Sequence, residues 1–225
     1  MKQPPSPQKS SNGTLVLGLD IGTSGTKALL IDDTGKVVGG QTVPHPISNP
    51  HPLWSEQNPR DWWSSAVEAI RITVAGKGVR ERIKGVGLAG QMHGLVCLDA
   101  GHHVLRPALL WNDQRTQAQC DWLHEHIGTD KLAAITGNRA LTGFTAPKLL
   151  WVRAHEPEVF GKIAHILLPK DYVRFRLSGT LATDLADASG TLLLDVKHRH
   201  WSEELLEAAE IPLQWLPSLH EGTDI

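Results

Sequence analysis

Cysteine, net charge and long apolar runs are all scarce in this chain of 225 residues. With only Cys97 and Cys120 present, a disulfide scaffold is excluded and a reducing cytoplasm is the expected compartment. The formal net charge of -2 provides no basic field for nucleic acid. No apolar run approaches the roughly 20 residues that a membrane-spanning helix needs, so no membrane partner is expected. What remains is an ordinary globular composition, with 40% apolar and 20% charged residues.

The first residues, MKQPPSPQKSSNG, are polar and rich in proline, and they lack the apolar core of a signal peptide. We predict that residues 1–13 form a disordered arm. No repeat with a fixed period follows. Since no change in composition divides residues 14–225, we expect them to form one domain.

Strand-like segments come first in that domain. Leu15 to Ile21, Lys27 to Asp32 and Lys36 to Thr42 are separated by short polar turns, which predicts an antiparallel meander. A buried strand is expected over 84–89, and further strands over 95–98 and 191–195. Helices are expected from Asn58 and Pro59, which suit a cap and a first turn, over 115–126, 147–153 and 171–177, and after Ser202. Strands followed by alternating helices and strands predict an α/β fold with a mixed sheet flanked by helices.

The first two strand segments enclose a polar turn within LVLGLDIGTSGTKALLID. Its glycines lack the G-x-G-x-x-G spacing of a dinucleotide-binding loop, and the Walker pattern fails because Thr26 separates Gly25 from Lys27. Two alternatives stay open. One is an ordinary hairpin whose turn is rich in glycine and threonine, and the other is a strand–turn–strand clip for phosphate.

Each residue of the turn has a chemical role in the phosphate-clip alternative. Gly22 and Gly25 let backbone N–H groups approach an anion closely, and Lys27 supplies positive charge. An aspartate would repel phosphate, so Asp20 makes chemical sense if it holds a bridging Mg²⁺, through water. Hydroxyl donors come from Thr23, Ser24 and Thr26.

Two further segments carry candidate ligand contacts. Gln91-Met92-His93 follows the strand over 84–89, at a strand end where α/β folds bind ligands. Histidine can hydrogen-bond a sugar hydroxyl and methionine offers an adaptable apolar surface, although packing alone also explains the pair. Trp111 to Thr116 (WNDQRT) precedes a helix, which Asn112 or Asp113 would cap in the simpler alternative. Arg115 is a candidate partner for a carboxylate.

Other polar residues are expected to be structural. The acidic pair in TDLADASG, Asp184 and Asp187, is predicted to hold loop backbone rather than perform acid–base chemistry. The twelve histidines include two H-x-H pairs, at 124 and 126 and at 198 and 200. No third and fourth ligand stands at zinc spacing, so we predict surface histidines rather than a metal site.

Several motifs, taken in order, resemble the FGGY carbohydrate kinases, and the resemblance runs from about Thr14 to the end of the chain. The motifs are LGLDIGTSGTKALLID at 17–32, GLAGQMHGLVCLDA at 87–100, LRPALLWNDQRT at 105–116, GFTAPKLLWVRAHEPE at 143–158 and LLPKDYVRFRLSGTLATDLADASGTLLLDV at 167–196. The first is similar to the phosphate motif of the actin-like ATPase (ribonuclease H-like) superfamily. Within the family, PHPLWSEQNP at 50–59 and GQMHG at 90–94 resemble members that act on D-xylulose.

This resemblance implies transfer of the ATP γ-phosphate to the 5-hydroxyl of D-xylulose in a cleft between two lobes. It places Mg²⁺ at Asp20, which is thereby the catalytic candidate of this chain. It assigns the phosphates to Gly22, Thr23, Ser24 and Lys27. The sugar is assigned to Met92 and His93 with Gln91, and to Trp111, Asn112 and Asp113, with Phe144 and Thr145 nearby.

In the family, a glycine-rich GGGDN-like segment of the second lobe carries the catalytic aspartate, and this chain has no such segment. The resemblance therefore implies that residues 14–225 are the N-terminal FGGY domain, inactive as a kinase alone and exposing a lobe face through which it self-associates. Two alternatives stay open: a kinase for ribulose, gluconate or glycerol, and a non-catalytic, single-lobe sugar-binding protein.

Overall fold

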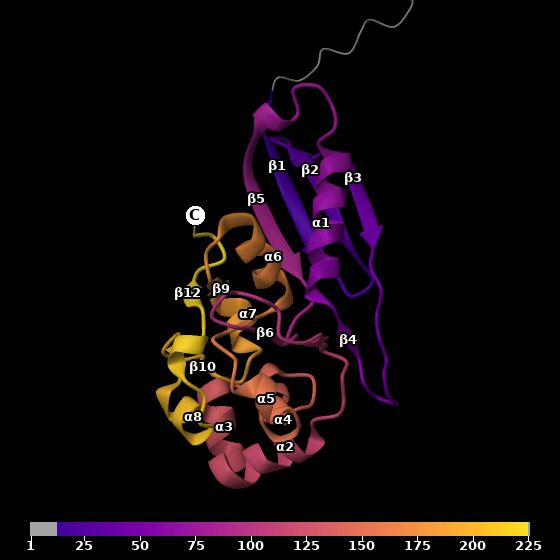
Figure 1. Cartoon of the computed structure of the whole chain (residues 1–225). Coiled ribbons are helices and arrows are strands. Elements are labelled where there is room, and N and C mark those ends of the chain that lie inside the picture. The colour runs from indigo at the N-terminus through magenta and orange to yellow at the C-terminus, as the bar shows by residue number, and fades with distance from the viewer. Residues whose placement is uncertain (1–12, 225) are drawn as a thin grey trace, which may run out of the picture.

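A computed structural model describes residues 13–224, and it begins with a four-stranded sheet (Figure 1). The strands are β1 (Leu15–Ile21), β2 (Gly25–Asp32), β3 (Val37–Pro44) and β5 (Ile83–Gly90), in the order β3-β2-β1-β5. The first three are antiparallel and β5 is parallel to β1. The structure thus confirms the predicted meander and mixed sheet. The predicted disordered arm lies outside the described residues, apart from Gly13.

Alternation along β1 decides which face of this sheet is buried. Leu15, Leu17, Leu19 and Ile21 are buried, whereas Val16 and Asp20 between them are exposed. Helix α1 (Pro59–Thr73) covers the buried face and packs on β2 and β3. Asn58 caps the helix as predicted, because its side chain accepts a hydrogen bond from the Arg60 N–H at 3.0 Å. Asp20 therefore points to the face that α1 leaves open.

The prediction that the strand over 84–89 is buried is wrong. The corresponding strand, β5, is mostly exposed, and Val86 retains 49% of its accessible surface. The physical reason is its place in the sheet, because within the described residues β5 pairs only with β1. Gly85 and Gly87 also contribute no side chain that could cover the strand.

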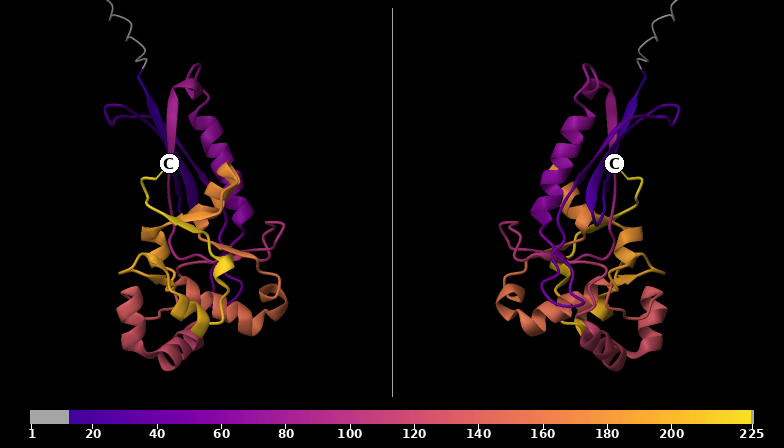
Figure 2. Two further views of the ribbon diagram at one scale, coloured as in Figure 1. Left: turned by 90° about the vertical axis from the view of Figure 1, so that its left-hand side faces the viewer. Right: turned by 90° about the vertical axis from the view of Figure 1, so that its right-hand side faces the viewer.

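Short strand pairs and helices build the other half of the molecule (Figures 1 and 2). The pairs are β4 (Glu56–Gln57) with β7 (Ala108–Leu109), β6 (Val96–Leu98) with β8 (His165–Leu167), β9 (Ala182–Asp184) with β12 (Ser218–His220), and β10 (Leu194–Asp195) with β11 (His200–Trp201). The helices are α2 (Gln117–Leu123), α3 (Thr129–Thr136), α4 (Thr145–His155), α5 (Pro157–Phe160), α6 (Pro169–Ser178), α7 (Leu185–Ser189) and α8 (Glu203–Ala208). A π-helical turn (His124–Gly128) joins α2 to α3, and 3₁₀ turns cover Arg80–Arg82 and Leu213–Trp215. The strand expected over 191–195 is reduced to β10.

Two apolar cores hold these halves. One joins the sheet and α1 to Tyr172 and Val173 of α6, and the other gathers side chains of α2, α4 and α8 around Leu149 and Trp151. The chain crosses to the other half after β3, returns from β4 to α1, and crosses again at the carboxyl end of β5, just before Gln91. Among the described helices, none has the length and apolar character needed to cross a bilayer.

Candidate functional site

The turn between β1 and β2 offers backbone N–H groups to a ligand, while its carbonyl groups accept hydrogen bonds from other segments of the chain. The Gln57 amide donates to the Thr23 carbonyl at 2.7 Å, and His45 Nε2 donates to the Gly22 carbonyl at 3.0 Å. The backbone N–H groups of Thr23 and Ser24 have no acceptor among the described residues. Free N–H groups beside occupied carbonyls are the arrangement that binds an anion.

Asp20 and Lys27 stand directly opposite each other on β1 and β2, beside this turn. Both side chains are exposed, and directly opposite residues share one face of a sheet. Within residues 13–224 the Asp20 carboxylate has no hydrogen-bond or ion-pair partner. A free carboxylate, a lysine and unpartnered N–H groups thus meet at one end of the open face.

Thr26 does not belong to this group, which corrects its predicted role as a hydroxyl donor to phosphate. The residue is fully buried, and its hydroxyl lies 2.9 Å from Ser65 Oγ on α1. The reason is the alternation of side chains along β2, which turns Thr26 toward the helix and Lys27 away from it.

Gln91 lies beneath the turn and joins it to the end of β5. Its backbone N–H donates to the Ile21 carbonyl at 2.8 Å, and its amide donates to Gln57 Oε1 at 2.8 Å. Gln57 Oε1 also accepts from the Trp62 indole at 2.9 Å. The predicted ligand residue Gln91 is thus buried, where it positions the turn through Gln57.

Trp111 connects the turn to the predicted sugar-binding residues. Its indole N–H donates to Thr23 Oγ1 at 3.0 Å, while 41% of the residue remains exposed. Met92 is likewise 48% exposed. Asn112 is exposed but lines a separate hollow beside the loop over 49–55.

The backbone of His93 is strained and held by α4. Its φ of 62° is in the left-handed region, which costs energy in a residue other than glycine. The His93 carbonyl accepts hydrogen bonds from Thr145 Oγ1 at 3.1 Å and from Lys148 Nζ at 2.9 Å. Phe144 packs edge-on against the imidazole, with 4.7 Å between ring centroids. Phe144 and Thr145 therefore support His93 from behind.

The other side of the His93 imidazole lies against Gly190. A Cβ atom added at Gly190 would overlap the ring, so only glycine leaves room for the ring in this position. Burial, and then the charge of Lys148, lowers the pKa of His93. The ring is thus held neutral, and a neutral imidazole can both donate to and accept from a hydroxyl.

The prediction that Asp113 lines the sugar site does not fit its position. Asp113 has no exposed surface, and its Oδ2 accepts the Ser55 N–H at 2.7 Å. The Arg115 guanidinium donates to both carboxylate oxygens, at 2.6 Å for the shortest bond. The structure confirms Arg115 as a carboxylate partner. Asp113 lies beneath the predicted sugar surface, where it anchors the backbone at Ser55.

A lysine that the sequence analysis missed lies at the centre of an acidic group from α6, β9 and α7. Lys170 Nζ contacts Asp171 at 2.8 Å, Asp184 at 2.7 Å and Asp187 at 2.9 Å. Burial alone would lower the pKa of Lys170, but these carboxylates raise it. One ammonium thus pairs with three carboxylates and offsets only part of their negative charge. The Asp184 side chain also accepts the Asp187 N–H at 2.9 Å, which confirms that it holds backbone.

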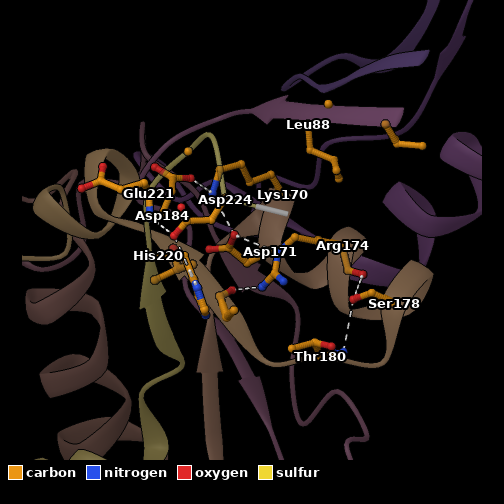
Figure 3. A pocket seen from close by; sticks show the side chains of 15 residues that line it. Leu88, Lys170, Asp171, Arg174, Ser178, Thr180, Asp184, His220, Glu221 and Asp224 are labelled. Atoms are coloured by element: carbon orange, nitrogen blue, oxygen red, sulfur yellow. Dashed lines mark hydrogen bonds and ion pairs between the residues drawn. The ribbon is translucent and has the colours of Figure 1, made fainter. Parts of the chain in front are cut away.

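Figure 3 shows a cavity of about 450 Å³ beside Lys170, under the exposed strand β5. None of the predicted ligand residues lines it. The exposed members of the predicted set, among them Asp20, Lys27, Met92 and Trp111, lie outside this cavity. Lys148 and Lys170 left no signal in the sequence because a helical lysine is ordinarily exposed.

The buried Lys148 predicts how the free energy of unfolding depends on pH. Burial lowers its pKa to about 7, from 10.5 for an exposed lysine. The unfolded chain keeps this proton up to about pH 10.5 and the folded chain releases it near pH 7. The unfolded state thus binds more protons between these values, so the free energy of unfolding rises with pH there, by at most about 1.4 kcal/mol per pH unit. Urea unfolding should show a smaller rise in Lys148→Met.

This comparison is best made between pH 6.5 and 8.5, because the folded chain releases the Lys148 proton within this range. Burial raises the pKa of Cys97 to about 12 and of Cys120 to about 11, from 9.0, so these thiols act in the opposite direction at higher pH. The matched control is Lys131→Met, which removes an exposed lysine and should keep the parental slope. An unchanged slope in Lys148→Met would contradict the assignment.

Comparisons with known proteins agree with this architecture. Residues 15–225 match the family described as FGGY family of carbohydrate kinases, N-terminal domain. The chain is 47% identical to a xylulose kinase of Klebsiella pneumoniae and 46% identical to one of Escherichia coli K12, in each case over 94% of this chain and 43% of the relative. A crystal structure from Brucella ovis, named as a "xyloylose kinase", superposes with a TM-score of 0.89 at 44% identity, over 93% of this chain and 43% of that chain. The chain thus spans less than half the length of these relatives, and the likeness confirms the predicted fold.

Proposed function

The chain belongs to the FGGY family of carbohydrate kinases, and we propose that it forms the N-terminal, sugar-binding lobe of an ATP-dependent D-xylulose kinase. The reaction would transfer the γ-phosphate of ATP to the 5-hydroxyl of D-xylulose. The observation that carries this proposal is the hydrogen bond between Trp111 and Thr23. It joins the turn suited to phosphate to the surface suited to a sugar, and phosphoryl transfer requires both substrates side by side.

The β1–β2 turn supports the phosphate half of the proposal. The N–H groups of Thr23 and Ser24 donate to phosphate oxygens beside Gly22, and Lys27 adds a positive charge. The free, exposed Asp20 carboxylate is the type of oxygen ligand that Mg²⁺ prefers, and in this family the ion would be held there, through water. When bound, Mg²⁺ would neutralise charge on the phosphates.

The surface around His93 supports the sugar half. A neutral imidazole that is held between Phe144 and Gly190 orients a hydroxyl of the ketose by hydrogen bonding. Met92 and Trp111 offer exposed apolar surface to the carbon face of the sugar, whereas Asn112 lines the separate hollow beside the loop over 49–55. Gln91 and Asp113 position these groups from beneath.

The proposal leaves the general base to the part of the relatives that this chain does not span. The isolated chain of 225 residues is accordingly expected to show no sugar-dependent ADP release. The free thiols of Cys97 and Cys120 support placing the protein in the cytoplasm.

The test is ADP release by the protein encoded in the whole reading frame that contains this chain. Mg-ATP is supplied with D-xylulose and, separately, with D-ribulose, L-ribulose, gluconate or glycerol. Release should be fastest with D-xylulose, and His93→Ala should lower kcat/KM about 10- to 100-fold through the lost hydrogen bond. His126→Ala, which changes an exposed histidine of the π-helical turn, is the control.

Two outcomes would contradict parts of this proposal. A preference for another of the sugars would keep the kinase and discard the assigned role of Met92 and His93. Absence of sugar-dependent release would favour the alternative of a non-catalytic sugar-binding protein.

A further inference from the structure

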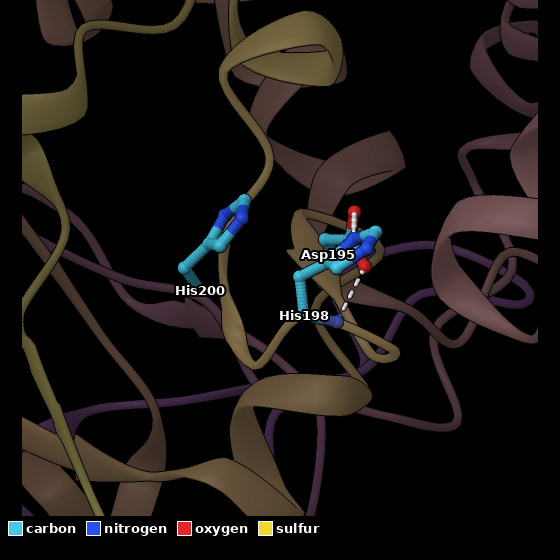
Figure 4. A group of neighbouring side chains, drawn as sticks. All are labelled: Asp195, His198 and His200. Atoms are coloured by element: carbon cyan, nitrogen blue, oxygen red, sulfur yellow. Dashed lines mark hydrogen bonds and ion pairs between the residues drawn. The ribbon is translucent and has the colours of Figure 1, made fainter.

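The hairpin formed by β10 and β11 brings Asp195, His198 and His200 together at the surface (Figure 4). One ligand-type atom from each residue lies within 4.8 Å of the other two. The hairpin lies outside the surface assigned to ATP and sugar. Neither H-x-H pair was expected to bind a metal, because no further ligand stood at zinc spacing. Asp195 provides a third candidate ligand, and the turn between β10 and β11 places it beside the two histidines.

The backbone of the hairpin fixes Asp195 relative to His198. The Arg199 N–H donates to the Asp195 carbonyl at 2.7 Å and closes the turn. Asp195 Oδ1 accepts the backbone N–H of His198 at 2.9 Å, and its Oδ2 lies 2.8 Å from His198 Nδ1. The carboxylate is therefore held in place before any ligand arrives, which lowers the entropy lost on binding.

His200 is oriented through its other ring nitrogen. Its Nδ1 lies 2.9 Å from the Trp201 carbonyl, and because a carbonyl only accepts, Nδ1 carries the proton. The lone pair of the neutral ring is then on Nε2. Metal-binding histidines almost always have this arrangement, with one nitrogen on a carbonyl or carboxylate and the other on the metal.

From this geometry we propose that Asp195, His198 and His200 bind a divalent transition-metal ion such as Zn²⁺ or Ni²⁺. Two imidazoles and a carboxylate are ligands that these ions accept, and three protein ligands leave a further position for water. Metal–ligand bonds of about 2.0–2.2 Å place the ligand atoms about 3.5 Å apart. The contact of 2.8 Å between Asp195 and His198 therefore opens on binding, and the exposed His198 ring rotates while His200 keeps its bond to the Trp201 carbonyl. Arg199 adds little repulsion because it pairs with Glu221.

The other H-x-H pair shows what the hairpin contributes. His124 and His126 have the same spacing but lie in the π-helical turn, where residues two apart do not face each other. His124 Nε2 accepts the Ala140 N–H at 3.0 Å, and His126 stacks on Trp122. Within residues 13–224, only the Asp195 cluster brings ligand atoms together in this way. The helical pair is therefore the matched control.

Calorimetric titration of the protein, purified without a histidine tag, with ZnCl₂ at pH 7.5 tests the proposal. We expect one Zn²⁺ per chain with a micromolar Kd. His198→Ala and His200→Ala should each weaken binding about 10- to 100-fold, as loss of a ligand or its support does elsewhere, and Asp195→Asn should weaken it as well. The double variant His124→Ala/His126→Ala should bind like the parent.

A thermal melt of each variant with and without Zn²⁺ separates loss of the site from loss of the fold. Zn²⁺ should raise the Tm of the parent and of the His124/His126 control by mass action. It should raise the Tm of folded His198→Ala and His200→Ala by less than that of the parent at the same Zn²⁺ concentration. The proposal is overturned if the parent binds no Zn²⁺ at 100-fold molar excess, if the His198 and His200 variants bind like the parent, or if the control pair loses affinity equally.

Discussion

Replacement of Arg115 by methionine is expected to lower the free energy of unfolding by about 3–5 kcal/mol, the largest change in stability that we anticipate from one substitution in this chain. The Arg115 side chain is 1% exposed and pairs with Asp113 at 2.6 Å and with Glu56 at 2.7 Å. Methionine fills the space but leaves Asp113 without a cation and Glu56 with Arg106 alone. A buried charge that loses its partner costs far more than the pair contributed.

The surroundings of Arg115 leave little room for compensation. Its guanidinium stacks on the Trp54 ring at 3.6 Å, a contact that methionine cannot replace electrostatically. Glu56 keeps its ion pair with Arg106 at 2.7 Å, so it loses only one of its two cationic partners. Asp113 keeps its hydrogen bond from the Ser55 N–H. Because Asp113 has no exposed surface, water cannot take the place of the guanidinium unless the surrounding structure opens.

Urea unfolding followed by tryptophan fluorescence measures the effect. The matched control is Lys131→Met, since Lys131 pairs with Glu204 at the surface, where the two side chains are 50% and 56% exposed. That change should cost less than about 1 kcal/mol. Arg115→Lys keeps the charge but loses the two-pronged contact, and should lie between the parent and Arg115→Met. Equal stability of Arg115→Met and the parent would show that the network contributes nothing.

Local patterns were sufficient to predict the first sheet and the turn within it. The apolar run from Leu15 to Ile21 matches the β1 that the structure shows, and Asn58 with Pro59 marks the start of α1. The polar turn at Gly22 to Ser24 stands out because it interrupts two apolar runs. These features depend on neighbours within a few residues, so the sequence contains their cause.

Burial and side-chain partners depended on residues far apart, and there the predictions failed or stayed open. Asp113 neither caps α2 nor has surface for a ligand, because it bonds Ser55, which lies 58 residues away in the sequence. The exposure of β5 follows from its place at the sheet edge, which its composition does not reveal. Lys148 is buried because α4 packs against neighbours on nearly all sides, a property of the fold rather than of the helix.

Replacement of Asp20 by asparagine is expected to lower kcat by about 100-fold or more in the protein encoded by the whole reading frame. The carboxylate is exposed beside the phosphate turn and has no partner within residues 13–224, and asparagine keeps its size while removing its charge. A role at the phosphates would leave the KM for D-xylulose near the parental value, because Met92 and His93 are unchanged. Steady-state ADP release at varied Mg²⁺ and sugar concentrations measures both parameters.

Stability separates this effect from misfolding. Since Asp20 has no partner among the described residues, the asparagine variant should unfold in urea within about 0.5 kcal/mol of the parent, as surface substitutions do. Asp33→Asn changes another exposed aspartate, at the far end of β2, and should leave both kcat and stability unchanged. A kcat within threefold of the parent for Asp20→Asn would remove Asp20 from the proposed chemistry, even if the protein proved to be a D-xylulose kinase. Loss of kcat with an intact fold and an unchanged KM would instead tie the Asp20 carboxylate on the open face to the transfer step, as its lack of a partner within residues 13–224 leads us to expect.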